Sequence, residues 1–302
     1  MPDEQVSLWS SFDQYIEKGE YAFLDNNFEE ALSFWREYVR ITGNSQWKNY
    51  CDEFENLLVI YRKIDTSEPE NYFNAWLEFR RLLYKNEIGS YPFNLMQRML
   101  AKNFLDKKTV ISFDLPTGIF CLIENKINLA KDNLQTVINH QPDNYLARMF
   151  YSRSFFAERN ERLATAYLSQ AIFIPDTNFL VFDIQSERIR NLYLRLDSLH
   201  GKNEVSLWLT PFELWYRNWL IWIEDLPFFR VIQQKERSER ILQVKYYSAE
   251  KYRHFMRCLY IAEYVRKFLP KERGIIWEQE AYMEKLDEPL FARYRKKRKP
   301  IA

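Results

Sequence analysis

Residues set 34 positions apart repeat one another between positions 111 and 178 of the chain. Leu129 and Ala130 recur as Leu163 and Ala164. Further pairs at the same interval are Leu134 with Leu168, Ile138 with Ile172, Gly118 with Ser152 and Cys121 with Phe155. A fixed interval of this length predicts an architecture in which each copy is one supersecondary unit that packs against its neighbours.

Small residues recur within each copy at an interval of twelve positions, and a third copy is found near the start of the chain. The pairs are Gly19 with Ala31, Gly118 with Ala130, and Ser152 with Ala164. Two antiparallel helices can cross closely only where small residues let their backbones approach. Pro142 and Pro175 follow the expected second helices, where proline ends a helix. We therefore predict helical hairpins over 12–45, 111–144 and 145–178.

This unit resembles the tetratricopeptide repeat (TPR), a helix-turn-helix solenoid element of 34 residues. Gly118, Ala130 and Pro142 fall on the family pattern, whereas Pro175 comes one place early and Pro116 interrupts the expected first helix. Ordinary helical hairpins are the alternative. The resemblance implies a right-handed superhelix that binds partners on its concave side, lined by the first helix of each unit, and uses no catalytic residues.

The resemblance assigns the concave face residue by residue. In the second and third units the lining is Leu115, Ile119, Leu122, Met149, Arg153 and Phe156, and in the first unit Ile16, Glu20 and Phe23. Family members that clamp acidic C-terminal tails carry Lys and Asn at these positions, so the apolar residues here contradict that clamp. We expect an apolar occupant: a partner's helix or peptide, a fellow subunit of a complex, or this chain's own C-terminal module.

The composition predicts an all-α fold over the remaining chain. Only six of 302 residues are glycine, and helix-favouring residues are abundant between the aromatic ones. Beyond the repeats we expect helices near 47–61, 70–85, 92–105, 186–200 and 275–286, with two more in 228–269. The expected domains are a TPR-like array over 1–180, a Trp-rich helical capping module over 181–290, and a basic tail over 291–302.

A further helix is predicted from Thr210 to Leu226, in the most aromatic part of the chain. Thr210, Pro211 and Glu213 resemble a helix start with an N-cap, a first-turn proline and a capping-box acid. Trp215, Trp219 and Trp222 then fall on one face, which we expect to be buried against 228–269. A membrane span is the alternative, but about 17 residues that include Glu, Arg and Asn are too short and too polar for one.

Signatures of chemistry are missing from the sequence. It has no Gly-rich phosphate loop, no Cys-x-x-Cys, no His-Glu-x-x-His and no Gly-x-Ser-x-Gly. We therefore expect no catalytic, cofactor-binding or metal-binding residues. Cys51, Cys121 and Cys258 are far apart in apolar contexts, which favours buried free thiols in a reducing compartment. Because no signal-peptide pattern follows Met1, a cytoplasmic location is expected.

Three classes of function follow from these observations. The first is a non-catalytic adaptor or scaffold subunit that mediates protein–protein interaction, in line with the repeats and the surplus of Trp and Tyr. The second is association with nucleic acid, possible only through the basic tail, since the net charge is +1. The tail residues are Arg293, Arg295, Lys296, Lys297, Arg298 and Lys299. The third is an enzyme with its site in 181–290.

Overall fold

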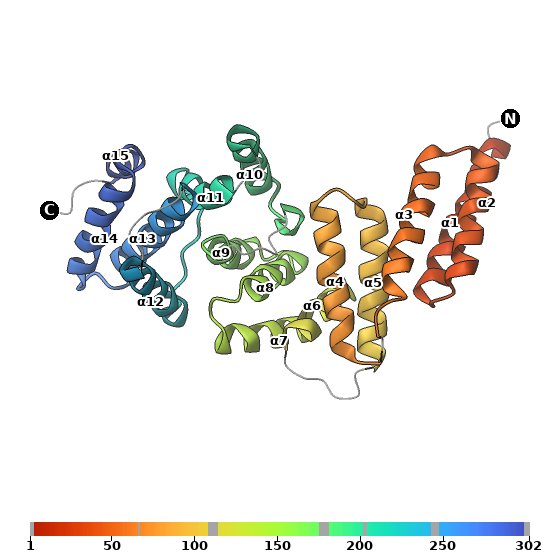
Figure 1. Cartoon of the computed structure of the whole chain (residues 1–302), viewed down its shortest axis with the longest axis horizontal. Helices are drawn as coiled ribbons and strands as arrows, with labels where there is room; N and C mark the ends of the chain where they lie inside the picture. The colour runs from red at the N-terminus through yellow and green to blue at the C-terminus, as the bar shows by residue number, and fades with distance from the viewer. Residues whose placement is uncertain are drawn as a thin grey trace. The chain divides into compact units, whose positions relative to one another are not determined.

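The structure is a computed structural model that describes residues 3–65, 67–107, 114–174, 181–201, 204–242 and 248–298. Within these ranges the chain forms fifteen α-helices and one 3-10 helix, with no strand (Figure 1). The all-α prediction is therefore confirmed. The chain divides into two compact units, 1–112 with 116–130 and 113–115 with 131–302. The predicted boundaries of the TPR-like array, the capping module and the basic tail rest on sequence patterns, whereas these two units rest on contacts within the fold. The predicted boundaries therefore stay predictions.

The first unit is built mainly from antiparallel helices joined by short turns. Its helices are α1 (Asp3–Leu24), α2 (Phe28–Thr42), α3 (Ser45–Tyr61), α4 (Pro69–Tyr84) and α5 (Ser90–Lys107), followed by α6 (Leu115–Ile123), whose residues from 116 belong to this unit. α1 packs on α2 and α5, and α3 packs on α2 and α5. Phe120 of α6 packs against α4 and α5, where its ring centroid lies 4.8 Å from that of Phe104.

Gly19 of α1 leaves room for a large side chain of α2. A Cβ atom on Gly19 would lie 2.1 Å from Nε1 of Trp35, so the Trp35 ring occupies the space that any side chain would need. Trp35 is fully buried and stacks on Phe54 of α3 with ring centroids 4.6 Å apart. The small residue at position 19 thus allows a large aromatic residue to join three helices.

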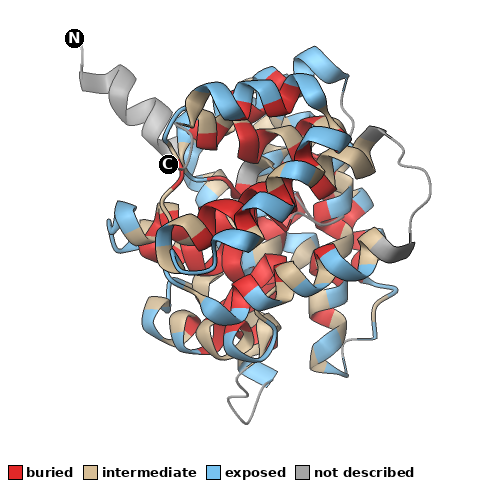
Figure 2. Cartoon of the chain, turned by 90° about the vertical axis from the view of Figure 1, so that its left-hand side faces the viewer, coloured by how far each residue is buried: buried red, intermediate tan, exposed pale blue. Residues whose placement is uncertain are grey.

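The second unit has α13 (Ser248–Phe268) at its centre. The other helices are α8 (Tyr145–Ala157), α9 (Glu161–Ala171), the 3-10 helix η1 (Val181–Asp183), α10 (Glu187–His200), α11 (Glu204–Tyr216), α12 (Leu226–Leu242), α14 (Arg273–Leu286) and α15 (Glu288–Lys297). α13 contacts α11, α12 and α14, and its residues from Phe255 to Val265 are all buried. Buried and exposed residues alternate along the helices of the chain (Figure 2). α7 (Ile127–His140) begins in the first unit and continues into the second.

The same turn closes the first helix of each predicted repeat. In the third repeat the amide of Glu158 bonds the carbonyl of Ser154, Arg159 bonds Phe156, and Asn160 bonds Phe155. Equivalent bonds occur at 25–27 and 124–126, and in each turn the middle residue, Asn26, Asn125 or Arg159, has a left-handed φ between 57° and 65°. This is the Schellman pattern, which satisfies the last carbonyls of a helix.

The helical hairpins predicted at 12–45 and 145–178 are present as α1 with α2 and α8 with α9, and 111–144 contains α6 and α7. Ala31, Ala130 and Ala164 are fully buried, and the Ser152 hydroxyl donates a 2.6 Å hydrogen bond to the Ala164 carbonyl. Pro175 lies outside the described residues. A right-handed superhelix stays a prediction.

Replacing Ala164 with leucine is expected to lower the free energy of unfolding by about 1 to 3 kcal/mol, because the added atoms must separate α8 from α9. Urea unfolding of the full chain, followed by circular dichroism, measures the change. Ala157→Leu is the matched control, since Ala157 is exposed at the end of α8. Equal stability of the two variants would mean that the helices do not cross at Ala164.

The helix predicted from Thr210 to Leu226 is wrong in both boundaries. α11 begins at Glu204 and ends at Tyr216, with Pro211 inside it. Asn218, with a φ of 58°, ends α11 with the same backbone hydrogen bonds as the repeat turns. Thr210 and Pro211 lie inside α11 and do not start it. The Thr210 hydroxyl donates to the carbonyl of Ser206, one turn earlier in the same helix. Residues 219–225 consequently form a non-helical segment.

Candidate interaction site

The residues assigned to the concave face are all buried or half-buried. Ile119, Met149 and Phe23 are buried, and the others, Leu115, Leu122, Arg153, Phe156, Ile16 and Glu20, are half-buried. Arg153 pairs with Asp183 of η1, with Nη1 and Oδ1 3.3 Å apart, and its guanidinium lies over the Phe150 ring. η1 therefore covers part of the first-helix face of α8, and the partner-binding role of these residues stays a prediction.

The three tryptophans that were predicted to share one helix face lie in two different elements. Trp215 lies on α11, and Trp219 and Trp222 lie in the non-helical segment 219–225. Trp215 is buried and stacks on Tyr294 of α15, with ring centroids 5.1 Å apart. Trp222 is half-buried, and its ring centroid lies 5.5 Å from that of Tyr260 of α13. Trp219 is half-buried beneath the guanidinium of Arg188, 4.2 Å from its ring centroid. The three side chains thus contact three different helices and do not share a helix face.

A buried arginine holds the end of this segment. Arg148 of α8 is fully buried, and its Nη1 lies 2.5 Å from the Gln170 side-chain oxygen and 3.0 Å from Oδ2 of Asp225. Its guanidinium also lies over the Phe228 ring, 4.1 Å from the centroid. Burial lowers the pKa of Arg148, and the carboxylate of Asp225 opposes that shift. The pair is stable because several hydrogen bonds offset the cost of removing two charges from water.

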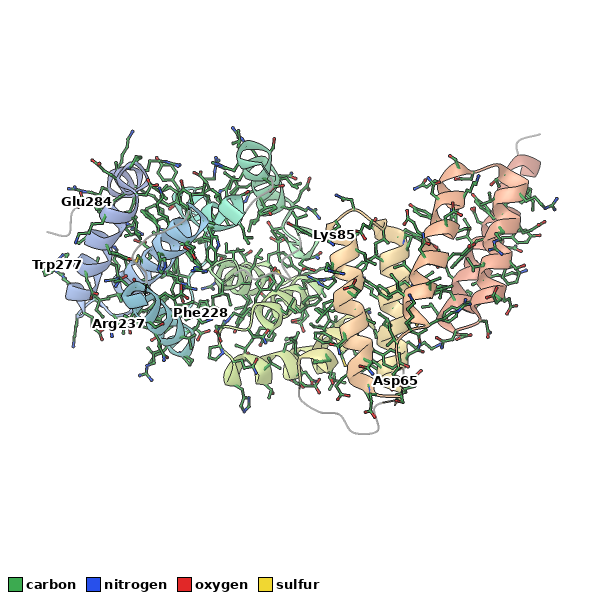
Figure 3. All side chains as sticks on the ribbon, in the orientation of Figure 1. Asp65, Lys85, Phe228, Arg237, Trp277 and Glu284 are labelled. Carbon is green, nitrogen blue, oxygen red and sulfur yellow. The ribbon has the colours of Figure 1, made fainter. Side chains whose placement is uncertain are left out.

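Asp225 also starts α12. Its Oδ1 accepts the Phe228 amide at 3.0 Å, which makes Asp225 the N-cap of a helix that has Pro227 in its first turn. The sequence carries this signal in the order Asp225, Leu226, Pro227, but the aromatic run upstream favoured a longer helix there. Figure 3 shows Phe228 at the start of α12. Arg148 itself has no comparable sequence signal, since its partners lie 22 and 77 positions away.

A groove of about 480 Å³ runs beside this segment. One wall is the last turns of α7, with Gln135, Ile138 and Asn139; the other wall is residues 223–227; Tyr167 of α9 also lines the groove. The walls combine apolar side chains with amides, a phenol and two carboxylates. Glu224 is exposed, and Asp225 is neutralised by Arg148. Such a mixture suits a peptide, which presents both apolar side chains and hydrogen-bonding groups.

Backbone groups of the segment bond the body of the unit at two points. The amide of Ile221 donates to the Ser169 hydroxyl at 3.2 Å, and the amide of Asp225 donates to the Tyr264 hydroxyl at 3.1 Å. These two bonds hold the segment against α9 and α13.

The predicted basic tail folds as helix up to Lys297. Arg293 pairs with Glu213 of α11 at 2.6 Å, and the Lys297 ammonium lies 4.2 Å from the Trp215 ring centroid. Arg298 forms an ion pair with Glu263 of α13. Arg295 and Lys296 are exposed, and Lys299 lies outside the described residues. Half of the predicted tail residues therefore bind the helices of their own unit.

His254 is buried in a charged cluster between α12 and α13. Glu239 lies 2.7 Å from Nη1 of Arg257 and 3.2 Å from Nη2 of Arg253. Burial, followed by the charge of Arg257, lowers the pKa of His254 from its ordinary 6.5 to about 4. His254 is therefore neutral at pH 7, where it fills the core as a polar but uncharged ring.

Stability is expected to fall as the pH is lowered from 6.5 to 4, because in this window the unfolded chain binds a proton that folded His254 does not. The difference between the ordinary and the folded pKa of His254 corresponds to a loss of about 3 kcal/mol in the free energy of unfolding between pH 7 and pH 4. Urea unfolding of the native chain and of His254→Gln across this range measures the effect. The variant should show a shallower pH dependence by that amount; parallel curves would contradict the assignment.

The described residues contain no group of three or more His, Cys, Asp or Glu side chains placed to hold a metal ion. The same ranges contain no helix with the length and hydropathy to cross a bilayer. Cys51, Cys121 and Cys258 are free and buried, as predicted, and burial raises the pKa of Cys51 to about 11. Comparison of the chain with protein-family models, with curated proteins and with solved structures gives no match.

Proposed function

We propose that this chain is a non-catalytic adaptor or scaffold subunit that binds a partner protein through an extended peptide. The observation that carries this proposal is the groove of about 480 Å³ between α7, α9 and residues 223–227. TPR-like helical repeats are the expected framework, in which stacked hairpins such as α8 with α9 build the binding surface.

The groove supports peptide binding in two ways. A peptide in the groove would lie along residues 223–227 and bond their backbone groups, and main-chain hydrogen bonds of this kind give affinity without requiring a particular sequence. The side-chain amides of Gln135 and Asn139, joined by a 2.9 Å hydrogen bond, and the phenol of Tyr167 also line the groove. Glu224 adds an exposed carboxylate that favours a basic side chain in the peptide.

The second candidate binding surface, which the TPR resemblance implies, is the face formed by the first helix of each predicted repeat. It requires the buried or half-buried residues, from Leu115 to Phe156, to become accessible. The groove beside α7 needs no such rearrangement, which favours it as the first contact to test. The charged clusters described in 181–290 are ion pairs within and between helices, so they do not by themselves support an enzyme active site there.

The experiment is selection of a random twelve-residue peptide library on the full chain, followed by calorimetry with the selected peptides. Asn139→Arg and Glu224→Arg should each abolish binding, since both residues are exposed on the groove walls. Asn191→Arg is the control, on the exposed face of α10. The groove proposal is wrong if no peptide is enriched or if the selected peptides bind both groove variants unchanged.

Affinity purification from the native cell with the same variants extends the test to the natural partner. Proteins that copurify with the native chain and with Asn191→Arg, but not with Asn139→Arg, are those that use the groove. Unchanged recovery with both groove variants would direct attention to the first-helix face.

A further inference from the structure

The last four helices carry a surplus of positive charge that the total of +1 conceals. Residues 226–302 contain 19 Lys or Arg and 10 Asp or Glu, whereas the preceding 225 residues contain 24 and 32. An asymmetry of this size between two parts of a chain points to an anionic partner for the basic part. The question is whether the positive charge is available at the surface.

Ion pairs within the unit leave the positive charge exposed. Seven of the ten acids, among them Glu236, Glu263 and Glu280, pair with basic residues. Eight exposed basic residues of the described part of 226–298 form no ion pair there: Arg230, Arg237, Lys267, Lys271, Arg273, Lys285, Arg295 and Lys296. The exposed acids without an ion pair in the same ranges are Glu272, Glu284 and Glu288.

An exposed tryptophan lies between two of these basic residues on α14, which also carries the exposed acids Glu278 and Glu284. Trp277 of α14 is 60% exposed, and Arg273, Trp277, Ala281 and Lys285 follow one another at intervals of four along the exposed side of the helix. A Cβ atom on Gly274 would have no neighbour within 4 Å, so the surface beside Trp277 is open. The two flanking cations are about 18 Å apart along the helix axis.

α12 extends this surface on one side. Arg240 of α12 pairs with Glu278 of α14 at 3.0 Å, which places α12 alongside the residue that follows Trp277. Arg237, one turn before Arg240, is exposed. Figure 3 shows Arg237 and Trp277 at the same end of the second unit. Lys267 lies in the last turn of α13, and Lys271 lies in the turn between α13 and α14.

We propose that this surface, formed by Trp277, Arg273, Lys285, Lys271 and Arg237, binds single-stranded nucleic acid. Proteins bind such strands by combining basic side chains for the phosphates with aromatic rings on which bases stack. A bilayer is disfavoured, because the large apolar residues exposed in the described part of 226–298 are only Leu226 and Trp277, and interfacial binding buries a continuous apolar face. The site differs from the basic tail, half of which is used in packing.

The test is fluorescence anisotropy of the full chain with labelled twelve-nucleotide oligouridylate and oligothymidylate. Saturable binding is expected at 50 mM KCl, and roughly 50-fold weaker binding at 200 mM, as for about four phosphate contacts on a single strand. Trp277→Ala should weaken binding about tenfold, whereas Trp277→Phe should retain most of the affinity. Glu284→Gln, which removes a negative charge from the surface, should strengthen binding.

Charge reversals locate the contact. Arg273→Glu with Lys285→Glu should abolish binding, and Lys63→Glu, an exposed residue of the first unit, should have little effect. Because Trp277, Arg273 and Lys285 are exposed, thermal melts of the variants should match the native chain. The proposal is overturned if neither oligonucleotide binds, if Trp277→Ala binds as tightly as the native chain, if Arg295→Glu with Lys296→Glu alone removes binding, or if phosphatidylserine vesicles bind and the oligonucleotides do not.

Discussion

Replacing Arg148 with alanine is expected to lower the free energy of unfolding by about 3 to 5 kcal/mol, because the change leaves the Asp225 carboxylate without its cation in a largely buried site. Asp225 also caps α12, and Gln170 loses its partner in the same change. Urea unfolding of the full chain measures the loss. Hydrogen exchange should show it first in α8, in α12 and in residues 219–225, which meet at this arginine.

Two further variants separate the charge from the packing. Arg148→Met combined with Asp225→Asn removes both charges and keeps an N-cap, so it should recover a large part of the stability lost in Arg148→Met alone. Arg162→Ala is the matched control, since Arg162 is exposed on α9 and should change stability by about 0.5 kcal/mol or less. A loss in Arg148→Ala no larger than in this control would mean that the buried pair does not hold the segment.

Replacing Trp35 with alanine is expected to lower the free energy of unfolding by about 3 to 5 kcal/mol, as large aromatic truncations in a core do. Trp35 is fully buried between Phe23 and Phe54, and its Nε1 donates to the Ile16 carbonyl at 3.3 Å. Because α1 and α3 both pack onto this ring of α2, small shifts of the neighbours do not refill the space it leaves. Urea unfolding of the full chain measures the change.

Gly19→Ala tests the same contact from the other helix. Its new methyl group would overlap the Trp35 ring, with an expected loss of about 1 to 3 kcal/mol or more. In the background Trp35→Phe the smaller ring removes the overlap, so the loss from Gly19→Ala should shrink. Gly274→Ala, at an open position of α14, should instead be neutral or slightly stabilising. Additive effects of Gly19→Ala and Trp35→Phe would contradict the close approach.

The helices of this chain could be predicted from sequence because their determinants are local. The pairing of small residues at Gly19 and Ala31 identified a hairpin, and Gly201 with its left-handed φ ended α10 as expected. α3, α4 and α5 lie close to the ranges predicted from apolar periodicity. In each case the signal and its effect lie within one or two turns of helix.

The region from 204 to 227 was predicted poorly because two local signals competed. The capping pattern at Thr210 resembled a helix start, whereas the stop at Asn218 and the start at Asp225 were obscured by a continuous aromatic run. The groove could not be predicted at all. Its walls come from α7, α9 and residues 223–227, and Arg148, which holds Asp225 in place, meets this partner across 77 positions.

The turn that closes the first helix of each predicted repeat also closes α4 and α11, so it does not mark the repeats alone. Its hydrogen bonds join backbone atoms only, so the middle residue of the turn needs only to adopt a left-handed φ. Asn26, Asn125 and even Arg159 adopt such a φ. Substitutions can accumulate in such turns while the buried crossing residues stay small. Further examples of the predicted repeat should therefore be sought by the spacing of the small crossing residues and not by the sequence of the loops.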